Sequence, residues 1–401
     1  MSERLRPATQ LVDRNCVRLH DGVMLPVPQS IQATTVLFDS PDRMLPIDKA
    51  SLTRQSGGLA DTFYYGPVGT PTTFALADNL CMLEDAAHCT LFPSGQAAIH
   101  AVMSVVARAG DEVLVTDSVT YTTRWMFDQV CARAGVSIRY FPATDVAAFA
   151  ARLSPRTKAV FFESPGSMLF EIQEVAAMAR LCRTRGIVTV LDNTWSASTF
   201  FNGFRTGLVD CVVLSLSKYH GAPMGVSGGA VLTNDAALHA ECVNFGALVG
   251  ATISPDAAAR IAAGLPNLRL RLAHQSATAM HLLPLIADRV GDEHVFHPAH
   301  RAFGQRSLWE RDFRGANSLL TVRCPVAGAD DVRALLLRFR MFRHGYGWGG
   351  DTSLVNVVAP NRERQFPVAP RDAAYLRLYV GMEDPADLER DLMHALGSVC
   401  R

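Results

Sequence analysis

The sequence predicts an α/β fold with a mostly parallel central sheet, followed by a smaller α+β region at the C-terminal end. Short apolar runs alternate with stretches of helical periodicity between residues 72 and 218. The runs TKAVFF, IVTVLD and DCVVLSL are apolar almost throughout, which is typical of strands buried on both faces of a parallel sheet. We therefore divide the 401 residues into an N-terminal arm (1–69), a large α/β domain (70–264) and a C-terminal α+β domain (265–401).

The first 69 residues show no sustained periodicity. They contain Pro, Gly and Gln, and then an aromatic stretch, TFYY, at 62–65. This pattern predicts an extended arm that packs on another subunit.

The large domain is predicted to begin with a helix, because TTFALADNLCMLEDA places Leu76, Leu80 and Leu83 at helical spacing. LFPSG follows as a short strand and Gly turn, and QAAIHAVMSVVARAG as a helix that ends at Gly110. The expected elements then follow in this order: strand DEVLVTD, helix RWMFDQVCARAG, strands VSIRYFP and TKAVFFESP, helix EVAAMARLCRTRG, and strands IVTVLDNT and VDCVVLSLSK.

The pattern changes after about residue 264. LRLRLAHQSATAMHLLPLIADRVG predicts a long helix that is interrupted or ended near Pro284, because proline removes a helical hydrogen bond. SLLTVRCPV, DVRALLLRFRMF, AYLRLYVGM and ADLERDLMHALGSV predict strand, helix, strand and helix. These elements indicate a smaller α+β domain.

The composition is that of an ordinary globular protein, with 49% hydrophobic and 19% charged residues. Lys+Arg and Asp+Glu both number 38, so the neutral balance gives no reason to expect nucleic-acid or acidic-membrane partners. The sequence contains no apolar stretch of about 18 residues or more, and its N-terminus lacks the apolar core of a signal peptide. The nine cysteines are scattered without a CxxC pair, as in reduced intracellular proteins. We expect a cytoplasmic enzyme.

Lys218 and Asp192 each end an apolar strand, and each has two interpretations. A lysine after a strand, flanked by Ser215 and Ser217, is most often exposed at the surface, but it can also form a Schiff base with hydroxyls nearby to hold a phosphate. An acid at a strand end can cap the next helix, or it can pair with the protonated pyridine nitrogen of a cofactor. Ligands of such sheets bind at the carboxyl ends of the strands, so we expect both residues near one crevice.

The segment FPSGQAA at 92–98 supplies a third signal. A Ser-Gly turn that opens a helix leaves the backbone N–H groups of Gly95 and Gln96 free at the positive end of the helix dipole, where an anion can bind. One such turn is weak evidence, because helix caps of this type are common.

Together, the order and spacing of these segments resemble the Cys/Met metabolism family of pyridoxal-5'-phosphate (PLP) enzymes of fold-type I. The resemblance covers about residues 64–384 and rests on YYGPVGTPTTF, LFPSGQAAI, FFESPGS, VLDNTW, SLSKY, YGWGGDTSL and LRLYVGMED. The Trp in YGWGGDTSL and the ESPGS segment make bacterial cystathionine β-lyases the most similar branch. The resemblance implies PLP as the cofactor and a dimer-based homo-oligomer, with a tetramer expected.

The resemblance also assigns roles to cofactor-binding residues of this chain. Lys218 matches the Schiff-base lysine, which also shuttles protons, and Asp192 matches the partner of the pyridine nitrogen. Ser217 and the N–H groups of Gly95 and Gln96 match the phosphate cradle, to which we add the hydroxyl of Ser215.

Three further residues match positions around the substrate. Arg377 matches the arginine that binds the substrate α-carboxylate, for which its planar fork is suited. Trp348 matches a tryptophan that lines the pocket near this arginine. Tyr65 matches a tyrosine that reaches the cofactor of the neighbouring subunit, and we include it with Lys218 among the catalytic candidates.

The sequence departs from the family at several positions of the same pocket. Pro67 stands where the family has an arginine that helps to bind the neighbour's phosphate, and proline has no side-chain donor. The tyrosine that stacks on the cofactor ring falls at Thr120, so either Tyr121 takes this role, as a cofactor-binding and catalytic residue, or the stacking partner is lost. Gly347 replaces a serine at the substrate site, and HGAPMGVSGG replaces the usual Gly-His-Ser-Asp run after the lysine.

The resemblance implies a carbon–sulfur lyase that performs β-elimination on cystathionine or a related S-substituted cysteine, giving a thiol, pyruvate and ammonia. Two alternatives stay open: γ-elimination or γ-replacement, including a specialised biosynthetic enzyme acting on an unusual amino acid, and a non-catalytic binding or regulatory relative. Only Pro67 supports the last alternative, and Lys218, Asp192 and Arg377 together oppose it. No metal is expected at His294, His297 and His300, because no Cys or acidic ligand set accompanies them.

Overall fold

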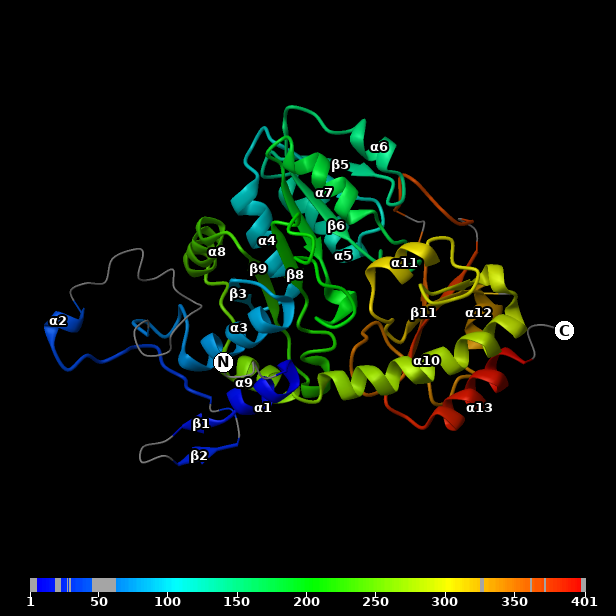
Figure 1. Cartoon of the computed structure of the whole chain (residues 1–401). Helices are drawn as coiled ribbons and strands as arrows, with labels where there is room; N and C mark the ends of the chain where they lie inside the picture. Colours follow the sequence, from blue (N-terminus) through cyan, green and yellow to red (C-terminus); the bar gives the residue numbers. More distant parts are fainter. Residues whose placement is uncertain are drawn as a thin grey trace.

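The computed structural model describes residues 6–18, 23–26, 28, 30–44, 63–324, 328–360, 363–370 and 373–397. Two sheets organise the chain, with the N-terminal arm on one side and the long helix α10 beneath the other (Figure 1). In the described part of the chain, no helix combines the length and apolar character needed to cross a bilayer.

The larger sheet has seven strands in the order β3-β9-β8-β7-β6-β4-β5. Their bounds are β3 (His88–Phe92), β4 (Glu112–Thr116), β5 (Ser137–Phe141), β6 (Thr157–Glu163), β7 (Val188–Asp192), β8 (Cys211–Leu214) and β9 (Gly229–Thr233). Strands β5, β4, β6, β7 and β8 pair in parallel, and β9 runs antiparallel to both β8 and β3. The predicted mostly parallel sheet is confirmed, although β9 was not expected from the pattern.

Helices cover both faces of this sheet (Figure 1). They are α3 (Pro71–Glu84), α4 (Gly95–Val106), α5 (Tyr121–Met126) with a π-helical turn (Phe127–Cys131), α6 (Val146–Ala150), α7 (Val175–Arg183), α8 (Ala236–Leu248) and α9 (Pro255–Gly264). Neighbouring strand residues face opposite cores: Leu191 packs in one hydrophobic cluster and Val190 in the other. Burial on both faces explains why the central strands are apolar almost throughout.

The second sheet has the strand order β10-β11-β14-β13-β12. The elements of this region are α10 (Leu268–Val290), β10 (Val295–Phe296), α11 (Arg306–Asp312), β11 (Leu319–Arg323), α12 (Ala329–Leu336), β12 (Arg343–His344), β13 (Leu354–Val358), β14 (Tyr375–Tyr379) and α13 (Pro385–Leu396). The prediction of a helix interrupted or ended near Pro284 was wrong, because α10 continues to Val290. Leu282, Leu283 and Ile286 are buried in the core around this proline, and their packing offsets the missing hydrogen bond.

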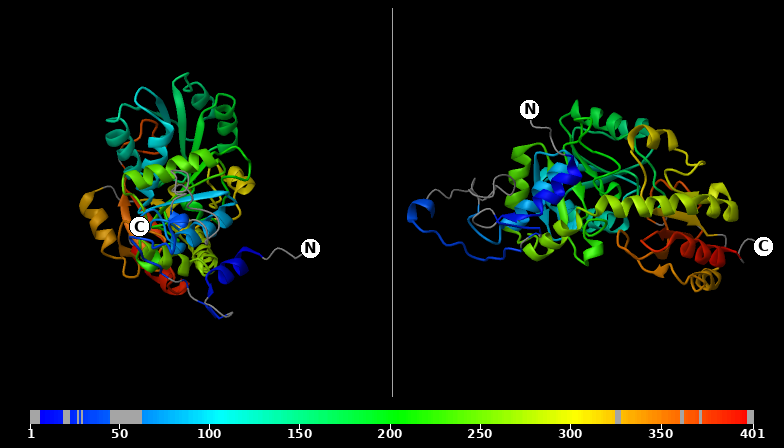
Figure 2. Two further views of the ribbon diagram at one scale, coloured as in Figure 1. Left: turned by 90° about the vertical axis from the view of Figure 1, so that its left-hand side faces the viewer. Right: turned by 60° about the horizontal axis from the view of Figure 1, so that its bottom comes forward.

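The described part of the N-terminal segment contains α1 (Pro7–Arg14), a two-stranded sheet of β1 (Val17–Arg18) and β2 (Met24–Leu25), and α2 (Pro41–Met44). α2 stands away from both large sheets (Figure 1; Figure 2). Leu37, just before it, is 90% exposed. Thr62, part of the predicted aromatic stretch, lies outside the described residues.

Candidate active site

A cavity of about 350 Å³ opens where β6, β7 and β8 end. It brings together most of the predicted residues: Gly95, Gln96, Asp192, Ser215, Ser217, Lys218, Trp348 and Arg377. Residues that were not predicted complete the lining, among them Ser94, Thr122, Glu163, Ser167, Met168, Thr194 and Tyr346. The cavity is thus built by both sheets, since Trp348 and Arg377 come from the C-terminal region.

The amine of Lys218 lies inside this cavity, 5.5 Å from the centroid of the Trp348 ring. Within the described residues it forms no hydrogen bond or ion pair. Burial lowers its pKa, the Arg377 guanidinium lowers this pKa further, and the Asp192 carboxylate acts in the opposite direction. A lowered pKa increases the share of neutral amine, which is the form that adds to a carbonyl.

Gly349, in the loop between β12 and β13, packs tightly against the backbone of Lys218 and Tyr219. Its φ of +97° suits glycine, and a Cβ there would lie 2.5 Å from both the Lys218 carbonyl carbon and the Tyr219 nitrogen. The same loop makes a second contact, because the ring of Tyr219 packs edge-to-face on the ring of Trp348, with centroids 5.3 Å apart. The loop that carries Trp348 therefore touches the lysine backbone directly.

Two carboxylates lie side by side at the sheet edge, because Glu163 and Asp192 are register partners in β6 and β7. Asp192 accepts a hydrogen bond from the Thr194 N–H at 2.9 Å, and Glu163 accepts one from the Thr120 N–H at 2.8 Å. Burial raises the pKa of Asp192, and the Lys218 charge opposes this effect. Burial, and then the Asp192 charge, raise the pKa of Glu163 well above its usual range. Asp192 is therefore a buried acid suited to a cationic partner.

The start of α4 presents backbone N–H groups that are suited to bind an anion. The Ser94 side chain accepts from the Ala97 N–H at 3.1 Å, while Gly95 and Gln96 occupy the first turn, where N–H groups have no partner within the helix. A Cβ on Gly95 would lie 2.6 Å from the Ser215 Cβ, so only glycine permits this close approach. Ser215, which lines the cavity, therefore lies directly against this turn.

Ser217 lies on the same wall but is tied to the backbone. Its hydroxyl donates to the Gly228 carbonyl at 3.2 Å and accepts from the Gly228 N–H at 3.1 Å. The oxygen lines the cavity, and contact with a bound phosphate requires the hydroxyl hydrogen to turn away from Gly228.

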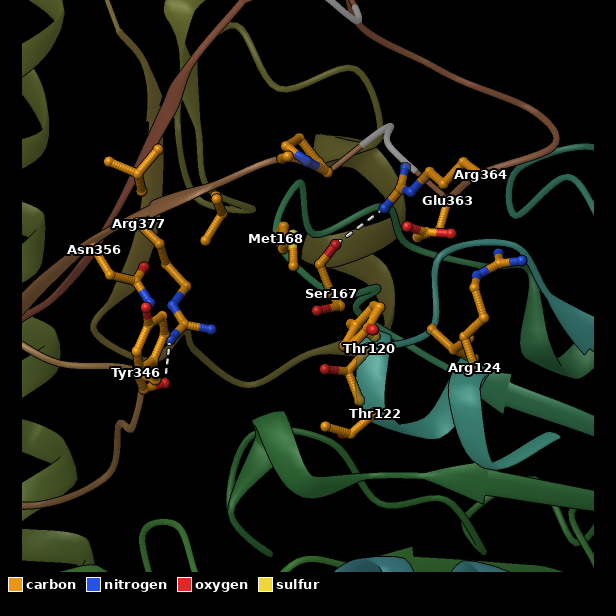
Figure 3. A pocket seen from close by; sticks show the side chains of 16 residues that line it. Thr120, Thr122, Arg124, Ser167, Met168, Tyr346, Asn356, Glu363, Arg364 and Arg377 are labelled. Atoms are coloured by element: carbon orange, nitrogen blue, oxygen red, sulfur yellow. Dashed lines mark hydrogen bonds between the residues drawn. The ribbon is translucent and has the colours of Figure 1, made fainter. Parts of the chain in front are cut away.

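Arg377, on β14, lines this cavity and donates a hydrogen bond to the Tyr346 carbonyl (Figure 3). Burial lowers the pKa of this guanidinium to about 10, so it still carries its charge near neutral pH. Most of its donors remain available to an incoming anion, because this is the one hydrogen bond that Arg377 donates within the described residues.

Three predicted residues lie apart from this group. Tyr65 is 52% exposed and does not line the cavity. Tyr121 is 49% exposed and stacks on Trp125 with centroids 6.0 Å apart, whereas Thr120 lines the cavity. Gly347 is exposed and lies outside the lining, although its neighbours on both sides contribute to it.

The residues present fit PLP, judged by their chemistry. An unpaired amine suits an aldehyde, a buried carboxylate suits a pyridinium nitrogen, and the N–H groups of α4 suit a phosphate. The fit rests on Lys218, Asp192, Gly95 and Gln96, all of which line one cavity.

Sequence reasoning missed Glu163 and Met168. Glu163 carries the same signal as Asp192, an acid that ends an apolar strand, and FFESP could have been interpreted in that way. Met168 carries no such signal: its φ of +71° is unusual for a residue other than glycine, and only the folded loop reveals it.

A buried polar cluster lies behind the cavity. The Asn193 amide donates to Glu84 at 3.2 Å, and the Ser198 hydroxyl lies 3.2 Å from the His220 Nε2 atom. Burial raises the pKa of Glu84 to about 7, and burial lowers the pKa of His220 to about 3, so His220 is neutral. Hydrogen bonds from Ser198 and Asn193 oppose the shift at Glu84. The cluster joins the loops that follow Asp192 and Lys218 to the end of α3.

Comparison with known proteins places the chain among relatives of both β and γ chemistry. It matches the family described as Cys/Met metabolism PLP-dependent enzyme over residues 26–397. A cystathionine beta-lyase from Bordetella avium is 32% identical over 92% of this chain and 91% of its own length. A cystathionine gamma-synthase from Mycobacterium tuberculosis is 31% identical over 94% of this chain and 98% of its own. A solved methionine gamma lyase from Micromonospora echinospora has a TM-score of 0.82 at 29% identity, covering 98% of this chain and 99% of that one.

Substituting Gly349 should damage both stability and cofactor binding. In Gly349→Ala the new Cβ meets the Lys218 and Tyr219 backbone, and the positive φ adds strain, for a loss of about 1–3 kcal/mol in unfolding free energy. Urea denaturation and the PLP content of the purified protein measure the two effects. Gly347→Ala is the matched control, since a Cβ there meets nothing within 4 Å. Equal stabilities of the two variants would contradict the close contact.

Glu84 should make stability depend on pH. Its folded pKa of about 7 lies above the ordinary value of 4.5, so between these pH values the folded chain binds more protons than the unfolded one. The unfolding free energy should therefore fall as pH rises through this window, by up to about 3 kcal/mol from this group. Glu84→Gln should flatten the curve in urea denaturation at several pH values. The exposed Glu241→Gln should leave it unchanged, and an unchanged curve in Glu84→Gln would exclude this source.

Proposed function

The chain belongs to the Cys/Met metabolism PLP-dependent enzyme family, as its motifs predicted, and from that premise we propose that it is a carbon–sulfur lyase. The proposed reaction is β-elimination on cystathionine or a related S-substituted cysteine, giving a thiol, pyruvate and ammonia. One observation carries this proposal: the unpaired Lys218 amine, the buried Asp192 carboxylate and the Arg377 guanidinium converge on a single cavity. The Bordetella avium relative, a cystathionine beta-lyase, supports the choice of reaction.

Four groups would hold the cofactor. The Lys218 amine would bind its aldehyde carbon, and the Asp192 carboxylate would keep a proton on its pyridine nitrogen. The N–H groups of Gly95 and Gln96, with Ser215 and Ser217, would bind its phosphate. When bound, PLP withdraws electrons from the substrate Cα and so stabilises the negative charge that develops there.

The protein side chains then control position and proton transfer. Arg377 binds the substrate α-carboxylate and so fixes which bond to Cα faces the Lys218 amine. The neutral amine removes the Cα proton, and its lowered pKa makes the neutral form available. The Cβ–S bond breaks with its electron pair on sulfur, and the protonated Lys218 can return a proton to the departing thiolate. The Trp348 ring covers the amine and limits the access of water.

A γ-elimination or γ-replacement is the second candidate. The observation that favours it is the likeness to a methionine gamma lyase and a cystathionine gamma-synthase. Both reactions use the same cofactor residues and carboxylate anchor, so the products formed must separate them.

We also infer a homo-oligomer, with a dimer as its basic unit and a tetramer expected. Support comes from Tyr65, which is half-exposed and outside the cavity of its own chain, as a residue that serves a neighbouring subunit would be. Tyr121 lines the adjoining cavity, so we assign it to substrate contact rather than to the cofactor ring. A cytoplasmic location is proposed from the free thiols of the described cysteines.

Product identification decides between the two reactions. The PLP-loaded protein, incubated with L-cystathionine and with simple S-alkyl-L-cysteines, should release pyruvate, measured by chromatography of the 2-oxo acids. From cystathionine the accompanying thiol should be homocysteine. Release of 2-oxobutyrate with cysteine would instead assign the protein to γ-elimination.

Lys218→Ala should abolish turnover. In the native protein, borohydride reduction followed by peptide mass spectrometry should find the cofactor attached to the peptide that contains Lys218. The exposed Lys158→Ala serves as control and should retain both turnover and attachment. Near-normal turnover in Lys218→Ala would overturn the assignment.

Arg377→Ala should lose about 3 kcal/mol of transition-state stabilisation, or roughly a hundredfold in kcat/KM, because the substrate carboxylate loses its charged partner. Steady-state kinetics with the best substrate measures this loss. An unchanged kcat/KM would show that another group anchors the carboxylate.

A further inference from the structure

A second cavity of about 550 Å³, whose lining residues are drawn in Figure 3, adjoins the cavity that contains Lys218, which we call the cofactor cavity. The two share lining residues, namely Thr120, Thr122, Ser167, Met168, Tyr346 and Arg377. A substrate whose carboxylate lies on Arg377 therefore has space beyond it for a large group. We call this second space the distal chamber.

Thr120 shapes the passage between the two spaces. Its backbone is fixed by the hydrogen bond from its N–H to the Glu163 carboxylate, at 2.8 Å. Its side chain is short, and the aromatic ring of the next residue, Tyr121, lies against Trp125. A large side chain at position 120 would project into the space that the two cavities share.

The arginines of the distal chamber, apart from Arg377, are already paired. Arg124 forms a buried ion pair with Asp117 at 2.5 Å. Arg364 pairs with the buried Glu171 and also donates to the Ser167 carbonyl at 3.0 Å (Figure 3).

Glu363, the acidic residue that lines the distal chamber, also has an interaction partner. The chamber therefore offers no free pair of charges within the described residues. The distal amino-acid end of cystathionine carries an ammonium and a carboxylate, and both would lose water there without a partner of opposite charge. The Asn356 Oδ1 atom, which has no hydrogen-bond partner within the described residues, is a neutral acceptor and does not replace such a charge.

The remaining walls are mainly apolar or aromatic. The apolar and aromatic residues are Val119, Tyr121, Met168, Tyr346, Val357, Val358, Ala359 and Pro360, and the polar residues Thr120, Thr122, Ser167 and Asn356 complete the lining. Such a surface gains free energy by covering an uncharged apolar group.

We propose that the distal chamber receives the S-substituent of the substrate, and that the preferred substrates are L-cysteines with a bulky, uncharged, largely apolar group on sulfur. This inference rests on the proposed carbon–sulfur lyase function and specifies its substrate class. The substrate and one water give one thiol, one pyruvate and one ammonium ion. The Cβ–S bond breaks with its electron pair on sulfur, which takes up a proton, and no oxidant or reductant is needed.

The test compares three substrates on the PLP-loaded enzyme, with pyruvate release as the readout. S-Benzyl-L-cysteine should exceed both S-methyl-L-cysteine and L-cystathionine in kcat/KM by about tenfold or more, as expected for a large apolar group in a matching pocket. Equal or better use of cystathionine would overturn the inference and leave the proposed lyase function standing.

Two variants locate the preference in the chamber. Val357→Phe and Ala359→Phe should each reduce the ratio of S-benzyl to S-methyl activity about tenfold, because each adds a ring to a residue that lines the distal chamber alone. Ala147→Phe, on an exposed position of α6, is the matched control for the added ring. An unchanged ratio in both chamber variants would also overturn the inference.

Binding supplies a readout independent of turnover. Calorimetry on Lys218→Ala loaded with PLP should show tighter binding of S-benzyl-L-cysteine than of L-cystathionine. If no S-substituted cysteine releases pyruvate in the native enzyme, the proposed function fails. The calorimetric comparison then tests the chamber separately. Equal affinities for S-benzyl-L-cysteine and L-cystathionine would show that the chamber does not select apolar groups.

Discussion

The parallel pairing of β6, β7 and β8 is the constraint on which the site depends. Parallel strands end at the same edge of a sheet, and the register places Glu163 directly beside Asp192. The chain that leaves β8 reaches Lys218 four residues later, over the same edge. Two acids and a lysine thus meet in a space that is largely closed to water. Their unusual pKa values follow from burial more than from any single contact.

The C-terminal sheet completes this site rather than merely flanking it. Trp348 and Arg377 come from that sheet and its loops, and Gly349 presses against the Lys218 backbone. Arg377 also lowers the pKa of the Lys218 amine, since two cations share a poorly solvated space. A substrate carboxylate that neutralises Arg377 would therefore change the charge environment of the amine as it binds.

Residues whose role follows from strand position and local geometry could be predicted from the sequence. Asp192 ends an apolar strand, Lys218 follows the end of another by four residues, and the Ser-Gly turn at Gly95 opens a helix, so local patterns indicated all three. The helix through Pro284 could not be predicted, because tertiary packing outweighs the local cost of proline. Whether Thr120 or Tyr121 faces the cavity depended on how the first turn of α5 is rotated, and no periodicity specifies that.

The loop at 346–349 has consequences for how this enzyme can evolve. Position 349 admits no side chain, whereas Tyr346 is 88% exposed and lines both cavities. Selection can therefore vary position 346 while position 349 preserves the placement of the lysine. Single substitutions at position 346 can therefore change which sulfur compounds the enzyme accepts, and the evolving variants keep their cofactor throughout.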